Sequence, residues 1–313
     1  MEIQVKGSGK SAIVLIHDGE NKLEIWPYCG GIINSWYAST ERRTINIISG
    51  YLDYEDFKNN CETKGFRSCK LSPYAGRIKK SSYSYEEEER EIGKFGFDDH
   101  NIHGLIYDRH FKVIETSNCE KEAIVTLATE YREINEGFPF NYRMEIRYKL
   151  SSNGKLTVET KVTNLSEKEM PLCDGWHPYF NLGTHINECY LQINSDKILE
   201  FDSDLIPTGK ISKFGNYAEP ELIEEAHFDN CFEITNTSDK VCVLKDPVSG
   251  LTISLYNELN YPYLQLFTPD DRNSLAIEPL SAPPDSFNNK IGLKYIGHGE
   301  CISFICRWEV NVE

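Results

Sequence analysis

Three short stretches, far apart in this chain, each carry one side chain able to move a proton. His103 lies in Asn101–Gly104, His177 lies in Asp174–Gly183, and Glu278 lies in Ala276–Pro279. Each stretch also holds aromatic, glycine or proline residues, which suit a shaped pocket better than a plain surface. Two histidines and a glutamate can form an acid/base pair with a helper group, and the opening of a sugar ring requires such a set.

His177 has the most informative surroundings, Trp176-His177-Pro178-Tyr179-Phe180. The proline disfavours a helical conformation at the residue before it and stiffens the loop. A stiff loop with aromatic neighbours can hold an imidazole in one orientation and shift its pKa. An isolated histidine is more often a packed or exposed residue, but this dense pattern favours a functional one.

His103 precedes Gly104, and a glycine lets the backbone approach a ligand closely. The same dipeptide is also typical of an ordinary turn, so this signal is weak by itself. We expect the remaining histidines to be structural or exposed; they are His17, His100, His110, His185, His227 and His298.

Glu278 follows the apolar run Leu275–Ile277. Two interpretations stay open: a charge that points to solvent at the end of a sheet, or a carboxylate delivered into a cleft. Burial in a cleft would raise its pKa and suit it to general base work near neutral pH. The downstream Pro283-Pro284-Asp285 predicts a rigid wall.

Asp229 and Arg77 are candidates for holding a sugar. An aspartate accepts two hydroxyl hydrogen bonds, and an arginine donates a planar fork of them, so both recognise vicinal diols. A salt bridge or an exposed side chain is the alternative for each.

Hydrophobic residues at every second position predict that the chain is mostly β-strand. Tyr142 to Leu150 and Leu156 to Val162 alternate in this way, and Ser151–Gly154 between them predicts a hairpin turn because Asn-Gly tolerates positive φ. A second hairpin is expected from Val241–Lys245 and Leu251–Tyr256. Further strands are expected at Ile13–His17, Lys22–Pro27, Thr44–Ile48, Phe111–Thr116, Ala123–Glu130, Cys189–Asn194 and Cys301–Val312. Strands at this density favour an all-β sandwich or barrel.

Helix is predicted at only two places, Tyr54–Cys61 and Pro220–Ala226. The charged run Glu86–Glu91 is expected to be a solvated loop or an edge strand. No Pro/Gly/Ser-rich linker divides the sequence, so we expect one domain over residues 1–313.

Composition excludes several classes of partner. Asp and Glu number 49 against 33 Lys and Arg, a net charge of -16, and so acidic a body repels nucleic acid and anionic membranes. The ten cysteines lack zinc-ligand spacing, so no metal is expected. No stretch approaches the about 20 apolar residues of a membrane span. No signal peptide is visible after Met1, and we therefore expect a cytoplasmic protein with reduced thiols.

Taken together, the motifs resemble the aldose 1-epimerase family of galactose mutarotase-like proteins. His177-Pro178-Tyr179-Phe180-Asn181-Leu182 is similar to the most specific motif of that family, and Asn101–Gly104 is similar to its first His-Gly motif. The other matching segments, in the same order along the chain, are Tyr51–Phe57, Pro73–Ile78, Phe228–Phe232, Tyr263–Thr268 with Gln265, and Glu278 with Pro284-Asp285.

This resemblance implies a β-supersandwich of many antiparallel strands with very little helix and a site in an open cleft. It implies Glu278 as general base and His177 as general acid, with Arg77, His103, Asp229 and Gln265 holding a monosaccharide. It implies no cofactor and no metal, and it says nothing of oligomeric state.

Three departures from the family pattern lie in the pocket segments, at Gly76, Leu105 and Pro279, so the resemblance does not specify galactose or glucose. Two alternatives also stay open. One is a hexose-6-phosphate epimerase of the same fold, for which Arg77, Lys79 and Lys80 are the candidate phosphate ligands. The other is a non-catalytic carbohydrate-binding protein, which would need no proton-transferring pair.

Overall fold

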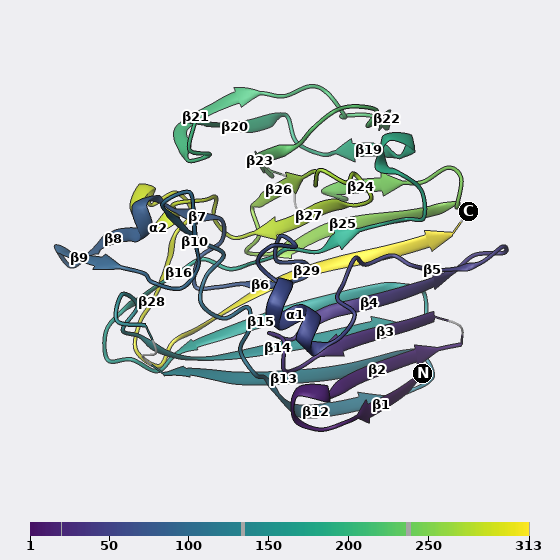
Figure 1. The fold of residues 1–313 in the computed structure, drawn as a ribbon, viewed down its shortest axis with the longest axis horizontal. Helices are drawn as coiled ribbons and strands as arrows, with labels where there is room; N and C mark the ends of the chain where they lie inside the picture. Colours follow the sequence, from purple (N-terminus) through teal and green to yellow (C-terminus); the bar gives the residue numbers. More distant parts are fainter. Residues whose placement is uncertain (20, 133–134, 236–238, 313) are drawn as a thin grey trace.

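The computed structural model describes residues 1–19, 21–132, 135–235 and 239–312, and β-strands make up most of its regular structure. The strand ladders are antiparallel (Figure 1). This agrees with the prediction of a mostly β protein from alternating hydrophobic residues.

The largest sheet in the described residues has nine strands. In spatial order they are β12 (Lys112–Asn118), β13 (Glu122–Arg132), β14 (Asn141–Ser151), β15 (Lys155–Asn164), β29 (Cys301–Val312), β25 (Leu251–Leu259), β24 (Cys242–Lys245), β19 (Tyr190–Ile193) and β22 (Glu221–Leu222). Every second side chain of β14 is buried, from Tyr142 to Leu150, as the alternation predicts. The predicted hairpin turn joins β14 to β15, with Gly154 at a φ of 73°.

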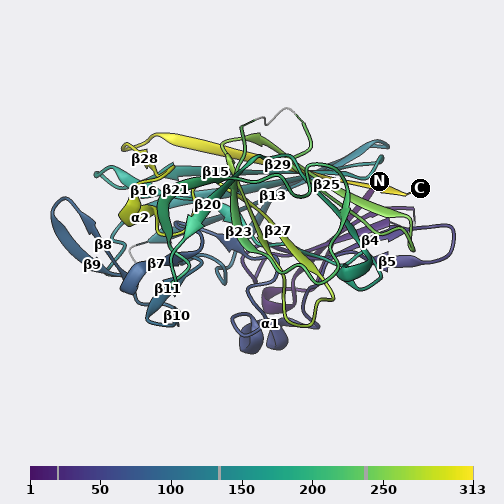
Figure 2. The same ribbon diagram turned by 90° about the horizontal axis from the view of Figure 1, so that it is seen from above.

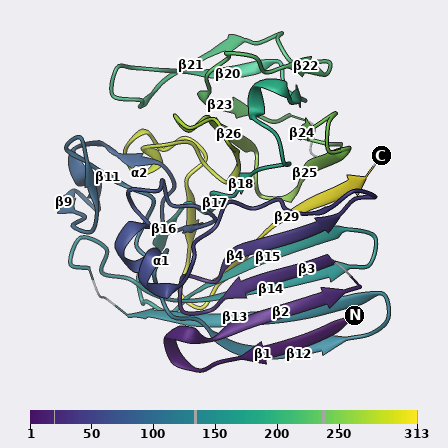
Figure 3. The same cartoon turned by 45° about the vertical axis from the view of Figure 1, so that its right-hand side comes forward.

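A five-stranded sheet covers one part of the nine-stranded sheet. Its strands are β1 (Glu2–Lys6), β2 (Ile13–Asp18), β3 (Asn21–Trp26), β4 (Ile32–Ser39) and β5 (Thr44–Asn46). Figures 1 and 3 both place β1 to β4 alongside β12 to β15. Ile16 and Ile25 of the smaller sheet share one buried cluster with Met144 and Tyr148 of the larger one, so the two sheets enclose a common core.

An eight-stranded sheet carries most of the chemistry-bearing residues. Its path is β21 (Pro207–Lys213), β20 (Lys197–Phe201), β23 (Asp229–Glu233), β26 (Tyr263–Phe267), β27 (Leu275–Leu280), β17 (Gly175–Trp176) and β6 (Lys70–Leu71), and β18 (Tyr179–Phe180) also pairs with β27. The stretches that contain His177 and Glu278 therefore become neighbours through β-pairing, although about a hundred positions separate them.

Short ladders and helices complete the described structure. They are β7 (Arg77–Ile78) with β11 (His100–Ile102) and β10 (Gly96–Phe97), β8 (Ser82–Tyr85) with β9 (Glu88–Glu91), β16 (Met170–Leu172) with β28 (Lys294–Ile296), the helices α1 (Tyr54–Asn60) and α2 (Ser286–Asn289), and three 3₁₀ turns, η1 (Gly9–Ser11), η2 (Lys79–Ser81) and η3 (Ile186–Glu188). Figure 2 shows α1 and the β10–β11 hairpin on the side of the molecule opposite β29. Across the described ranges, the helices fall short of the length and apolar character needed to cross a bilayer.

The prediction of a helix at Pro220–Ala226 is wrong. Glu221–Leu222 is the short strand β22, which pairs with Tyr190 and Leu191 of β19. Pairing with an existing sheet edge satisfies backbone groups that two helical turns would leave mostly unpaired. The acidic run Glu86–Glu91 forms the turn and the second strand of the β8–β9 hairpin, and its glutamate side chains are exposed. This matches the predicted edge strand.

Candidate active site

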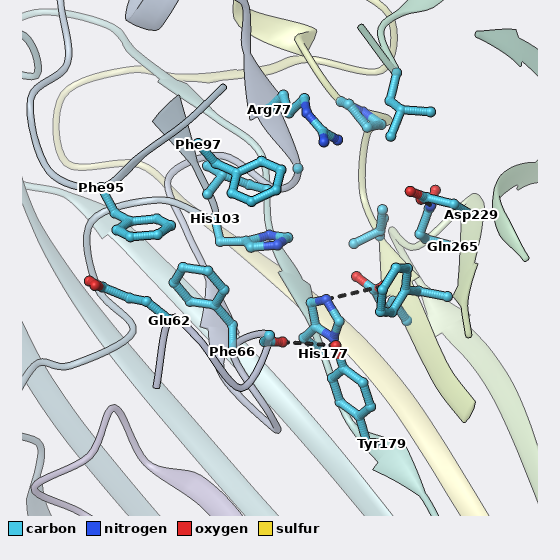
Figure 4. Close-up of a pocket in the computed structure, with 18 of the residues that line it drawn as sticks. Glu62, Phe66, Arg77, Phe95, Phe97, His103, His177, Tyr179, Asp229 and Gln265 are labelled. Atoms are coloured by element: carbon cyan, nitrogen blue, oxygen red, sulfur yellow. Dashed lines mark hydrogen bonds and ion pairs between the residues drawn. The ribbon is translucent and has the colours of Figure 1, made fainter. Parts of the chain in front are cut away.

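A cavity of about 400 Å³ lies where the eight-stranded sheet meets the β7–β11–β10 ladder and the segment after α1 (Figure 4). The structure brings all six predicted site residues to its wall. They are Arg77, His103, His177, Asp229, Gln265 and Glu278.

His177 is held by backbone hydrogen bonds on two sides. Its N–H donates to the carbonyl of Cys69 at 3.1 Å, and its own carbonyl accepts from the N–H of Ser68 at 2.8 Å. The next residue, Pro178, accepts from the N–H of Ile277 at 3.1 Å. Because β6 lies on one side and β27 on the other, the loop cannot shift without breaking strand pairing.

The imidazole of His177 faces Glu278. Its Nε2 lies 3.4 Å from Oε1 of Glu278, and both side chains are buried. The ring stacks on Tyr179, with centroids 4.9 Å apart and an interplanar angle of 6°, and it meets the edge of His103 at 5.0 Å. Tyr179 is itself anchored, because its hydroxyl donates to the carbonyl of Gly65 at 3.0 Å.

Strand register gathers the acidic and amide groups. Gln265 of β26 pairs directly with Glu278 of β27, so the two side chains leave the sheet on the same face. Asp229 of β23 pairs with Phe267, two residues from Gln265, and its Oδ1 accepts from Nε2 of Gln265 at 2.8 Å. Oε1 of Gln265 is buried and finds no hydrogen-bond partner among the described residues, so it remains available to a bound hydroxyl.

Arg77 enters the cavity from the ladder opposite the sheet. Its guanidinium lies over the ring of Phe97, 5.5 Å from the centroid. The glycine before it is required here: Gly76 has a φ of 64°, and a Cβ on it would lie 2.7 Å from Cγ of Pro284. Asp285 then fixes this strand, because its N–H donates to the carbonyl of Arg77 at 2.7 Å.

His103 occupies a tight turn. Its φ of 63° is in the left-handed region, and its N–H donates to the carbonyl of Gly76 at 3.0 Å. A Cβ on the following Gly104 would lie 2.3 Å from the carbonyl oxygen of Ser72, so only glycine fits there. Phe66 packs against the imidazole edge-on at 4.7 Å. Nδ1 of His103 and Nδ1 of His177 are both buried without a partner in the described part of the chain.

Burial dominates the electrostatics of the cavity. It lowers the pKa of His177 to about 3 and, with the positive charges of His177 and Arg77, lowers that of His103 well below its ordinary value. It raises the pKa of Glu278 well above its ordinary value, and the nearby Asp229 raises it further. The pKa of Asp229 is also raised by burial, against the opposing effect of Arg77. Across the range between these values, His177 and Glu278 together hold one proton.

Several residues that line the cavity could not be predicted from the sequence. Aromatic side chains form the wall on the His103 side, and Phe66, Phe95 and Phe97 are among them (Figure 4). They come from loops and a short hairpin, where no periodic pattern marks them. Tyr179 was visible as part of the His-Pro-Tyr-Phe run, but nothing in the sequence indicated that its ring stacks on His177.

Comparison with known proteins agrees with this architecture. The family model for aldose 1-epimerase matches residues 11–306. An aldose 1-epimerase of Streptococcus thermophilus is 29% identical over 284 residues, which cover 78% of each chain. The uncharacterised protein YihR of Escherichia coli is 25% identical over 240 residues, which cover 74% of each chain.

Solved structures share the fold over nearly the whole chain. A galactose mutarotase-like protein of Clostridium acetobutylicum has a TM-score of 0.86 and 23% identity, and the match covers 100% of this chain and 99% of that one. A galactose 1-epimerase of Lactobacillus acidophilus has a TM-score of 0.79 and 16% identity, and the match covers 99% and 98%. The expected β-supersandwich of antiparallel strands with very little helix is confirmed. The chain belongs to the aldose 1-epimerase family, whose members are isomerases.

Proposed function

We propose that this protein interconverts the α and β anomers of a free hexose by acid/base-catalysed opening and closing of the sugar ring. The observation that supports this most directly is the 3.4 Å separation of His177 Nε2 and Glu278 Oε1 in a buried cavity. The anomeric hydroxyl and the ring oxygen are bonded to the same carbon. A base for the first and an acid for the second must therefore lie within several ångströms of each other, and this pair does.

The reaction moves two protons and breaks one bond. Glu278 as carboxylate takes the proton of the anomeric hydroxyl while His177 as imidazolium gives its proton to the ring oxygen. The bond between C1 and the ring oxygen breaks, and C1 becomes an aldehyde. Rotation about C1–C2 presents the other face, and closure returns both protons with the roles reversed.

The reaction starts from Glu278 as carboxylate and His177 as imidazolium. This charged pair holds one proton, as does the pair in which both groups are uncharged. Burial favours uncharged Glu278 and uncharged His177, with one proton on the carboxyl group. Moving that proton across the 3.4 Å contact yields carboxylate and imidazolium. Hydroxyl groups of a bound sugar would donate to the carboxylate and accept from the imidazolium, which favours this charged form in the complex.

The other predicted residues would hold the sugar. Arg77 would donate a planar fork of hydrogen bonds, while Asp229 and Oε1 of Gln265, which has no partner among the residues that the structure describes, would accept from hydroxyls. The aromatic wall at Phe66, Phe95 and Phe97 suits the apolar C–H face of a pyranose ring.

The cavity favours a neutral sugar over a hexose 6-phosphate. Its wall includes the acidic residues Glu62, Asp229 and Asp270, which would repel a phosphate. Of the suggested phosphate ligands, Lys79 instead forms ion pairs with Asp202 at 3.4 Å and Asp204 at 3.7 Å, outside the cavity wall.

Polarimetry tests the proposal. Fresh α-D-glucose and α-D-galactose should reach anomeric equilibrium faster with the protein than in buffer, whereas glucose 6-phosphate should gain little. If no aldose in a broad panel equilibrates faster, the protein is not an aldose 1-epimerase in function.

The variant Glu278→Gln separates catalysis from binding. Glutamine keeps the shape of the side chain but cannot take a proton, so we expect kcat to fall about 10²–10⁴-fold while sugar binding by calorimetry is retained. Glu219→Gln, which makes the same change at an exposed position, should leave kcat unchanged. Full turnover in Glu278→Gln would rule out Glu278 as the base.

A further inference from the structure

A pair of oppositely charged side chains lies wholly inside the protein beneath the His177 loop. Lys70 of β6 and Asp174, the residue before β17, are both 0% exposed. Nζ of Lys70 donates to Oδ1 of Asp174 and, at 3.1 Å, to the carbonyl of Gly175. The same Nζ lies over the ring of Trp176, 4.5 Å from its centroid. The proton transfer proposed above uses neither side chain.

Asp174 is a junction between strands that carry site residues. Its Oδ1 also accepts from the hydroxyl of Tyr261 at 2.6 Å, and Tyr261 lies just before β26, the strand of Gln265. Its N–H donates to Oγ of Ser281 and its carbonyl accepts from the N–H of Ser281, both at 2.8 Å. Ser281 follows β27, the strand of Glu278.

Lys70 ties the same junction to β6. Lys70 pairs with Trp176 across the two strands, and the residue before Lys70 accepts the N–H of His177. The backbone N–H of His177 is therefore bonded to the residue next to Lys70, and the backbone N–H of Ser281, three positions after Glu278, is bonded to Asp174 itself. A change in the Lys70–Asp174 geometry would move β6 and β17 relative to β27.

From these contacts we propose that the Lys70–Asp174 ion pair is a positioning device that sets the separation of His177 from Glu278, a role that rests on the proposed function. Two apolar side chains of similar volume would stabilise such a site as well or better, because both charges must be taken out of water. What the ions add is direction: a charged group with several hydrogen bonds fixes strand offset more sharply than apolar packing does.

The double variant Lys70→Met/Asp174→Leu tests this role. Because it removes both charges together, it should keep the fold and a melting temperature close to that of the wild type. We expect kcat to fall on the order of 10- to 100-fold, since a displacement of an ångström costs that much in an oriented acid/base pair. KM should change by less than about threefold, because Arg77 of β7 and Asp229 of β23 stand on strands that neither Lys70 nor Asp174 contacts by the hydrogen bonds described above.

Two further measurements separate positioning from stability. The side-chain ¹⁵N–¹H NMR signals of His177 should shift in the double variant, a readout that does not depend on turnover. As a matched control, Leu156→Ala opens a cavity in β15 of the nine-stranded sheet. It should lower the melting temperature but leave kcat unchanged at temperatures where the protein is folded.

Tyr261→Phe serves if the double variant does not fold. It removes only the hydroxyl that donates to Asp174, and kcat should fall about fivefold with KM unchanged. Wild-type kcat in a folded double variant, or in Tyr261→Phe, would overturn the positioning role. If the wild-type protein is inactive on every aldose, the proposed function is overturned. In that case the NMR measurement still tests the positioning role, and unshifted His177 signals in the double variant would overturn it.

Discussion

At the scale of single residues, the site is a pair of groups whose ordinary proton affinities are brought into reverse order. An imidazole normally binds a proton more tightly than a carboxylate does. Burial lowers the pKa of His177 and raises that of Glu278, so the proton of the pair rests on the carboxyl group. The pair therefore titrates as one unit with two macroscopic steps.

This ordering predicts a broad plateau in the pH dependence of kcat/KM. As pH rises through the lowered pKa of His177, about 3, the pair goes from two protons to one and activity rises. As pH rises through the raised pKa of Glu278, the last proton leaves and activity falls. Stopped-flow polarimetry across the pH range should find the acid limb well below the ordinary histidine value. An acid limb near pH 6.5 would mean that His177 titrates as if exposed.

At the scale of elements, α1 supports the cavity wall from outside. Glu62, Gly65 and Phe66, which line the cavity, follow the helix directly. The helix starts at Asp53, whose side chain accepts from the N–H of Asp56 at 2.8 Å. Asp56 in turn accepts from Leu52 N–H at 2.9 Å and from Nζ of Lys64, which lies in the lining segment.

Asp56 gives this element a pH-dependent contribution to stability. Its hydrogen bond from Lys64 holds its pKa at about 2, below the ordinary value, so the stabilisation is complete above about pH 4 and is lost as pH falls towards 2. Asp56→Asn should therefore melt at a lower temperature than the wild type at pH 7, with the difference narrowing below pH 4. Glu55→Gln, an equal charge change at an exposed position in the same turn, should melt like the wild type at every pH. A pH-independent difference for Asp56→Asn would exclude the ion pair as its cause.

At the scale of the whole molecule, the sequence could predict what depends on local pattern. Alternation located β14 and β15 almost to the residue, and the run around His177 pointed to a side chain that lies on the cavity wall. The sequence could not predict that Glu221–Leu222 would pair with β19 as a short strand, because that pairing is non-local. Nor could it predict the approach of Arg77 to His103, which depends on the pairing of β7 with β11.

The core that the nine-stranded and five-stranded sheets share leads to a prediction about the stability of the whole molecule. Ile146 of β14 is 0% exposed, so Ile146→Ala should lower the free energy of unfolding by about 2–5 kcal/mol through lost burial and the cavity left behind. Ile114→Ala makes the same change in β12, where the side chain is 48% exposed, and should cost much less. Urea denaturation followed by tryptophan fluorescence measures both, and equal costs would contradict the burial described here.

The adjacency of β18 and β27 has a kinetic consequence. These two strands lie roughly a hundred residues apart in the chain. Contacts between distant segments are slow to form because a long loop must close first. No early local structure can bring the imidazole and the carboxylate together. After dilution from denaturant, we therefore expect turnover to recover later than secondary structure, in the final step of refolding.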